Sequence, residues 1–207
     1  TCKDYDIMSH QFAALIIVLP LVVSFFVFFS GWWLKKSGYP LTLAALACCL
    51  LLSVGILESV LSNGVIRYRL GGWDPPWGIE YYVDPLNAIM LVLVCFLSLL
   101  TAVFSRRSVE IEVPEKGALF WALYLLLITG LLGIIVTGDL FNLFVLLEVA
   151  SLSGYVLIAV GEKKSLFASF RYVVIGTMGA SFYLLGVGYL YIGTGSLNMA
   201  DLSQLRS

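Results

Sequence analysis

The stretch GDLFNLFVLLEVASLSGYVLIAVG, residues 138–161, decides the fold of this chain. It holds an almost unbroken apolar run of about 20 residues, the length that an α-helix needs to cross a bilayer. One charged residue, Glu148, interrupts this run near its centre. A charged side chain in hydrocarbon is unfavourable by about 3 kcal/mol or more, and such residues usually serve a function.

The composition indicates an integral membrane protein. Of the 207 residues, 60% are hydrophobic and only 12% are charged, whereas a soluble domain is about 25% charged. The same percentages exclude a disordered chain. The formal net charge of -1 gives no basic surface for nucleic acid, so we expect no nucleic-acid partner.

Five further apolar runs resemble the first one in length. Continuous runs favour helices over a β-barrel, whose strands alternate in hydrophobicity, so the predicted fold class is an all-α membrane protein with about six transmembrane helices. The expected spans are residues 11–34, 40–62, 84–104, 117–137, 139–160 and 169–192. The chain then divides into an N-terminal extension (1–10), helices one and two (11–62), an outer loop rich in Gly, Pro and Trp (63–83), and helices three to six with an outer C-terminal segment (84–207).

The basic residues set the expected orientation. The six spans place eight Lys and Arg on one side of the membrane and four on the other, and the richer side faces the cytoplasm. We therefore expect a multi-pass protein of the plasma membrane with both ends of this chain outside. The eight are Lys35, Lys36, Arg106, Arg107, Lys116, Lys163, Lys164 and Arg171; the four are Lys3, Arg67, Arg69 and Arg206.

The loop RYRLGGWDPPWGIEYYVDPLNA, residues 67–88, is rich in glycine, proline and aromatic residues. Aromatic side chains suit the membrane interface, and the adjacent prolines exclude a regular helix. An interfacial cap built of turns is the simpler interpretation, and a binding loop is the alternative.

Neither a metal site nor a cofactor site is predicted. The four cysteines lack metal-ligand spacing with the single histidine, His10. Nucleotide-loop, haem and iron–sulfur motifs are absent from the sequence. We expect no cofactor in this chain, and nothing in it indicates a quinone site.

Glu148 is the candidate functional residue. In a helix over residues 139–160 it lies about 3 Å from the centre, too deep for its short side chain to reach the interface. It must then be protonated, paired with a cation, or facing a hydrated cavity. Burial raises the pKa of a carboxyl group and a nearby cation lowers it, so a carboxyl balanced between these effects can exchange protons near neutral pH. A neutral glutamic acid hydrogen-bonded to a neighbouring helix is the structural alternative.

Four residues are candidates for a supporting role. Ser151 and Tyr155 follow Glu148 by three and seven positions and share its helix face. Arg171 lies about one turn into the sixth span, as an interfacial anchor or as a water-linked partner of Glu148. Asp139 begins the fifth span, where a carboxylate is favourable at a helix N-terminus. An N-cap is the simpler interpretation of Asp139, and a proton exit port is the more specific alternative.

Three stretches carry a family resemblance. GGWDPPWGIEYYVDPLNAIM (71–90), TGDLFNLFVLLEVASLSGYVLIAVGE (137–162) and SFRYVVIGTMGASFYLLGVGYLYIGTGSLNMADLS (169–203) resemble the antiporter-like membrane subunits. This family is shared by Mrp-type cation/proton antiporters, energy-converting membrane hydrogenases and respiratory complex I. The resemblance covers about residues 60–205, and the Mrp-type D subunit and its hydrogenase relatives look most similar.

The resemblance implies a function. Glu148 matches the fifth-helix glutamate of the family's ion path, which the family pairs with a lysine on a broken seventh helix. Arg171 resembles a basic residue found early in the family's sixth helix. The chain would hold only the first six helices of a longer fold, so it is expected to be a fragment, a split subunit or a truncated paralogue, with the basic partner of Glu148 outside these 207 residues.

We therefore expect a membrane subunit of a multisubunit ion-translocating complex, with Glu148 in a proton or sodium/proton pathway. The expected partners are other membrane subunits, the lipid bilayer, and protons or sodium ions. A truncated paralogue acting as a non-transporting structural subunit is the alternative.

Overall fold

The structure is a computed structural model that describes residues 2–33, 38–73, 76–161 and 163–205, with the side chains of 2–10, 32–33, 163–164 and 205 left aside. Lys35, Lys36 and Arg206, which entered the predictions above, lie outside the described residues. The elements are α1 (Cys2–Trp33), α2 (Gly38–Asn63), β1 (Ile66–Arg69), a 3₁₀ turn (Leu70–Gly72), β2 (Glu80–Val83), α3 (Pro85–Glu112), α4 (Gly117–Val136), α5 (Leu140–Ala159), α6 (Lys163–Thr194) and α7 (Met199–Leu205).

Among the described residues, 6 helices are long and apolar enough to cross a membrane. Their apolar spans are Gln11–Gly31, Gly38–Asn63, Pro85–Glu112, Gly117–Val136, Leu140–Ala159 and Ser165–Thr194. These spans confirm the predicted helical membrane fold. They also show that α1 continues through Pro20 and that α3 extends to Glu112, beyond the predicted end at 104.

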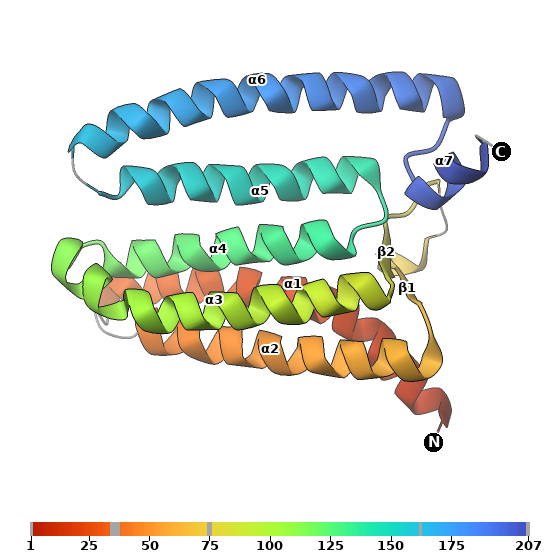
Figure 1. Cartoon of the computed structure of the whole chain (residues 1–207), viewed down its shortest axis with the longest axis horizontal. Helices are drawn as coiled ribbons and strands as arrows, with labels where there is room; N and C mark the ends of the chain where they lie inside the picture. The colour runs from red at the N-terminus through yellow and green to blue at the C-terminus, as the bar shows by residue number, and fades with distance from the viewer. Residues whose placement is uncertain (1, 34–37, 74–75, 162, 206–207) are drawn as a thin grey trace.

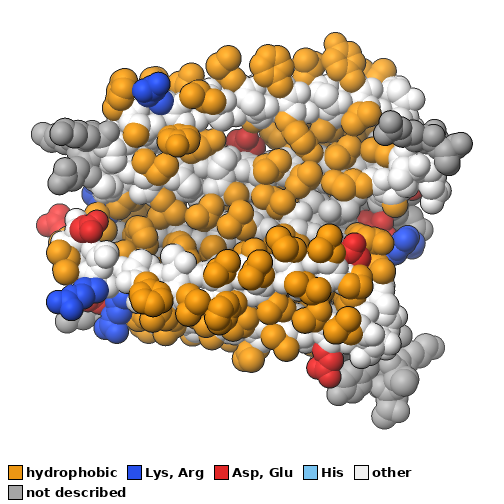
Figure 2. Space-filling view, viewed as in Figure 1, with side chains coloured by type: hydrophobic (Ala, Val, Ile, Leu, Met, Phe, Trp, Pro, Cys, Tyr) orange, Lys and Arg blue, Asp and Glu red, His pale blue; other side chains and the backbone are white. Residues whose placement is uncertain are grey.

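The helices lie side by side and antiparallel to their chain neighbours (Figure 1). We call the end that carries β1, β2 and α7 the hairpin end. The opposite end, where the α3–α4 and α5–α6 connections lie, is the basic end. On the face that Figure 2 shows, charged side chains gather mainly at these two ends and hydrophobic side chains cover most of the band between them.

Helix α4 is the centre of the bundle, with α1, α2, α3 and α5 packed around it. Its contact with α1 is very close at the basic end, because a Cβ added at Gly31 would lie only 2.3 Å from the Cβ of Ala118. Glycine at this position therefore allows the two helices to approach. The core between the helices is apolar, and its largest fully buried side chains include Ile16, Leu46, Ile56, Leu91, Leu125 and Leu132.

The loop between α2 and α3 contains a two-stranded antiparallel hairpin, which pairs Ile66 with Val83 and Arg69 with Glu80. The sequence predicted only turns in this segment. The positive φ angles of Gly71 (67°) and Gly72 (76°) reverse the chain after β1, a conformation that glycine adopts without strain. Trp73 and Trp77, in contrast, are 68% and 86% exposed, whereas Tyr81 is buried in the core. An interfacial position for the aromatic residues of this loop remains a prediction.

Helices α5 and α6 form the outer layer beside α4 (Figure 1). Small residues set the α4–α5 distance, since a Cβ added at Gly130 would lie 2.7 Å from the Cβ and the backbone nitrogen of Ala150. Most of the large apolar side chains of α6 are exposed in this chain. Such a surface can face the lipid chains, or it can pack against apolar faces of neighbouring helices.

Candidate functional site

Glu148 is the ninth residue of the 20-residue helix α5. Its side chain is half-buried. Glu148 therefore lies near the middle of α5, and its role remains a prediction. Leu146 and Ala150 mark the side of α5 that faces α4, because both are buried against glycines of that helix. Phe144 and Tyr155, four residues before and seven after Glu148, mark the side that faces α6. Helical spacing puts Glu148 on this second side.

Towards the hairpin end, an aromatic contact joins α5 to α6. The rings of Phe144 and Tyr183 stack with their centroids 6.1 Å apart. The Tyr183 hydroxyl also donates a hydrogen bond of 3.2 Å to the backbone oxygen of Leu140, at the start of α5. This contact fixes the distance between the two helices on one side of Glu148.

Towards the basic end, a second aromatic contact joins the same helices. Tyr155 stacks on Tyr172 with centroids 6.4 Å apart, and the hydroxyl of Ser169 donates a 2.7 Å hydrogen bond to the backbone oxygen of Tyr155. Glu148 lies between the two contacts along α5. Because the helices are antiparallel, the pairs 144–183 and 155–172 place Glu148 opposite the segment around Gly179.

The two hydroxyl-bearing residues on the Glu148 face of α5, Ser151 and Tyr155, make different contacts. Ser151 donates a 3.3 Å hydrogen bond to the backbone oxygen of Glu148, so its hydroxyl contacts the helix backbone of that residue. Tyr155 is half-buried and turned to α6. Both residues lie on α5 beside Glu148, and a role for either in ion transfer remains a prediction.

Arg171 lies on α6 near the basic end, and its side chain is exposed. Through the 155–172 pairing it is level with residue 156 of α5, so it is about 12 Å from Glu148 along the helix axis. Among the described side chains, Arg171 and Glu148 form no ion pair with each other. An interfacial position for Arg171 fits this distance, and any link to Glu148 would need water.

Asp139 is the N-cap of α5, as the sequence indicated. Its carboxylate accepts a 2.7 Å hydrogen bond from the backbone N–H of Asn142. The side chain is only 8% exposed. Burial raises the pKa of the Asp139 carboxyl above 3.8, and the hydrogen bonds from backbone N–H groups oppose this shift only in part.

A second buried carboxyl at the hairpin end was not singled out from the sequence. Glu80 of β2 is 4% exposed, and one of its oxygens accepts a 2.9 Å hydrogen bond from the side-chain amide of Asn198. Asn198 also caps α7, because its side-chain oxygen accepts from the backbone N–H of Ala200 at 2.8 Å. The stretch SLNMAD predicts the helix cap at Asn198. It does not predict the hydrogen bond to Glu80, because 118 positions separate the two residues.

Backbone hydrogen bonds complete this junction. The N–H of Gly138 donates to the oxygen of Glu80, and the N–H of Met199 donates to the oxygen of Gly138, both at 2.9 Å. The N–H of Leu140 donates to the oxygen of Leu197 at 3.0 Å. The hairpin, the start of α5 and the segment before α7 are thus joined in one network.

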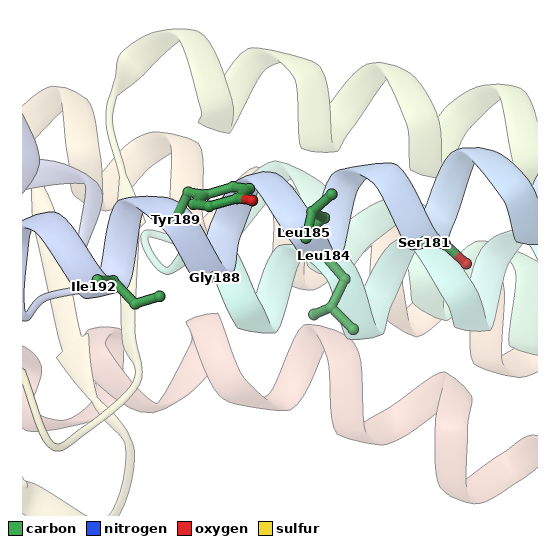
Figure 3. A pocket seen from close by; sticks show the side chains of 6 residues that line it. All are labelled: Ser181, Leu184, Leu185, Gly188, Tyr189 and Ile192. Carbon is green, nitrogen blue, oxygen red and sulfur yellow. The ribbon is translucent and has the colours of Figure 1, made fainter.

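No group of three or more His, Cys, Asp and Glu side chains in the described part of the chain could hold a metal ion. A groove of about 570 Å³ runs along one side of α6 (Figure 3). Its lining residues all come from this helix and are Ser181, Leu184, Leu185, Gly188, Tyr189 and Ile192. The groove is open and apolar, and Glu148 is not among its lining residues.

Comparison with known proteins agrees with this architecture. Residues 137–206 match the family described as NADH:quinone oxidoreductase/Mrp antiporter, transmembrane. The chain is 44% identical over 203 residues to the N subunit of the NADH-quinone oxidoreductase of Desulforudis audaxviator, a match that covers 96% of this chain. It is 33% identical to the D subunit of the Na⁺/H⁺ antiporter of Alkalihalophilus pseudofirmus over 91% of this chain.

The chain belongs to the antiporter-like membrane subunit family. The fold of this antiporter-like chain also matches solved structures. It superposes with a TM-score of 0.87 and 38% identity on a chain of the membrane-bound sulfane sulfur reductase, an archaeal respiratory membrane complex, over 94% of this chain and 40% of that one. It superposes with a TM-score of 0.82 and 25% identity on a chain of the Mrp complex from Dietzia sp., over 94% of this chain and 36% of that one.

The antiporter-like chain is thus a multi-pass membrane protein whose relatives are subunits of multisubunit membrane complexes. It spans about 40% of the length of the curated relatives that it matches, namely 40% of the oxidoreductase N subunit and 38% of the antiporter D subunit.

Proposed function

We propose that this chain is a membrane subunit, or part of one, in an ion-translocating complex of the plasma membrane, with Glu148 in its proton pathway. The observation that carries this proposal is a half-buried carboxyl group at mid-span on α5, turned towards α6. A carboxyl group at this depth is costly without a function, and the family relationship supports ion translocation as that function.

Glu148 would accept a proton from a hydrated half-path on one side and release it towards a basic group on the other. The hydroxyl groups of Ser151 and Tyr155, on the same helix face, would help to order water near the carboxyl. Asp139 would stand at the hairpin end of the path and Arg171 at the basic end. With the orientation from the basic residues, the hairpin end would face outside and both chain ends with it.

The basic partner of Glu148 would come from another helix. Within the described spans, Arg106 and Arg107 lie in the last two turns of α3, and Arg171 is displaced from Glu148 by about 12 Å. No described Lys or Arg is therefore level with Glu148. Sodium is the second ion that such a path could carry, because a carboxylate can ligate a hard cation as well as a proton.

The test is Glu148→Gln in the complete membrane complex that contains this chain, with Glu58→Gln as the matched control. Glu58 is an exposed glutamate near the hairpin end of α2, so its substitution makes the same chemical change away from the path. Proton uptake into inverted membrane vesicles, divided by the amount of assembled complex, should fall about 100-fold or more with Glu148→Gln and stay within about twofold with Glu58→Gln. A wild-type rate in Glu148→Gln would refute the role of Glu148.

A non-transporting structural subunit is the second candidate function. It is favoured by the exposed apolar surface of α6, which suits packing against other membrane subunits. In that case Glu148→Gln would leave translocation unchanged, while deletion of the chain would prevent assembly of the complex.

A further inference from the structure

Tyr155 of α5 fits closely against Gly176 of α6, on the basic side of Glu148. A Cβ added at Gly176 would lie 1.8 Å from the Tyr155 hydroxyl oxygen, 2.7 Å from Cζ and 3.2 Å from Cε2 of the same ring. All three of these atoms belong to one side chain. The tip of the Tyr155 ring therefore occupies the space that any larger residue at 176 would need.

Two other contacts hold the same tyrosine. Its ring stacks on Tyr172, one turn before Gly176, and its backbone oxygen accepts the hydrogen bond from Ser169. Three residues of α6 thus contact Tyr155 from one side. Because the ring is stacked on Tyr172, a methyl group at 176 would have to push the ring out of this stack or move the helix outward.

We infer that Gly176 is a positioning residue for the Glu148 site: it lets Tyr155 pack tip-first against α6 and so sets the α5–α6 distance beside the carboxyl. This inference rests on the proposed role of Glu148 in ion translocation. Tyr155 and Glu148 are seven residues apart on one face of α5, about 10 Å along the axis. The displacement needed to relieve a 1.8 Å contact is larger than 1 Å, and a shift of this size at a reacting group can lower a rate about 100-fold.

The neighbouring glycine on α6 provides a matched control. Gly179 lies on the segment opposite Glu148, yet a Cβ added there would meet no atom within 4 Å. Gly176→Ala and Gly179→Ala add the same methyl group to the same helix three positions apart. They differ in whether the methyl group collides with Tyr155.

The experiment compares these two variants in the complete complex, by proton uptake per assembled complex in inverted vesicles. Gly176→Ala should lower the rate at least about tenfold, and Gly179→Ala should stay within about twofold of the wild type. Tyr155→Phe removes the oxygen that makes the 1.8 Å contact. In the Tyr155→Phe background the oxygen is gone but Cζ, at 2.7 Å, remains, so Gly176→Ala should cost less than in the wild type, about threefold. A general loss of helix packing would not produce this partial compensation.

A rate in Gly176→Ala equal to that in Gly179→Ala would overturn the inference. So would a tenfold loss that persists undiminished with phenylalanine at 155, because the collision would then not involve the Tyr155 hydroxyl. The failure of the proposed function has a different signature, since it appears as a wild-type rate in Glu148→Gln whatever the result at Gly176.

Discussion

Replacing Gly130 with alanine should push α5 away from α4. The added Cβ would lie 2.7 Å from the Cβ and backbone nitrogen of Ala150 and 2.9 Å from its Cα. Carbon atoms in contact are about 3.5–4.0 Å apart, so the methyl group is too close by about 0.8 Å. Two of the three atoms belong to the backbone of α5 and cannot rotate aside. The helix itself must move.

Overpacking of this kind typically costs about 1–3 kcal/mol, and we expect this loss in the free energy of unfolding for Gly130→Ala. At Gly133, in contrast, the added Cβ would meet only the flexible side chain of Leu146, and the loss should be smaller. Gly154→Ala is the control on α5, because nothing lies within 4 Å of a Cβ there. Alanine also favours a helix more than glycine by about 1 kcal/mol, so this control should be neutral or stabilising.

Reversible unfolding of the purified chain in mixed micelles, followed by circular dichroism as SDS is added, measures all three variants under one condition. Equal stabilities for Gly130→Ala and Gly154→Ala would refute the reasoning, because the α4–α5 distance would then not depend on the missing side chain at 130.

Two further predictions concern the hairpin end. Asn198→Ala removes the amide that donates to the buried Glu80 and the oxygen that caps α7. We expect the free energy of unfolding to fall by about 1–3 kcal/mol in the same assay. An unchanged stability would contradict the structural role of the Asn198–Glu80 pair. Asp139→Asn keeps an N-cap acceptor for Asn142 but cannot ionise. Because burial raises the pKa of the Asp139 carboxyl above 3.8, stabilisation by its protonated form is complete below that value and is lost as the pH rises through the folded-state pKa. The asparagine variant should therefore exceed the wild type in stability at about pH 7 and approach it at about pH 4; a difference independent of pH would contradict the buried carboxylate.

The spans and the N-cap could be predicted from the sequence because their signals are local. The run from Leu140 to Ala159 is long enough to span a bilayer by itself, and an aspartate just before such a run is a common helix N-cap. The depth of Glu148 follows from its position in the same run. None of these predictions needs knowledge of another segment.

The features that the sequence did not predict depend on pairs of distant residues. The hairpin strands are only four residues each, too short for an alternation pattern to stand out among glycines and prolines. The burial of Glu80 depends on Asn198, and the fit of Tyr155 depends on which α6 residue lies opposite it. The register between two helices cannot be read from either helix alone.

The close contact between Gly31 of α1 and Ala118 of α4 has a consequence for how the chain is made. Roughly 80 residues separate the end of α1 from the start of α4, which corresponds to about 4 to 16 seconds of synthesis at 5–20 residues per second. During this interval the α4-facing side of α1 has no partner, while α2 and α3 can already pair with each other. Helix α1 must therefore wait in lipid, or beside the insertion machinery, until α4 arrives.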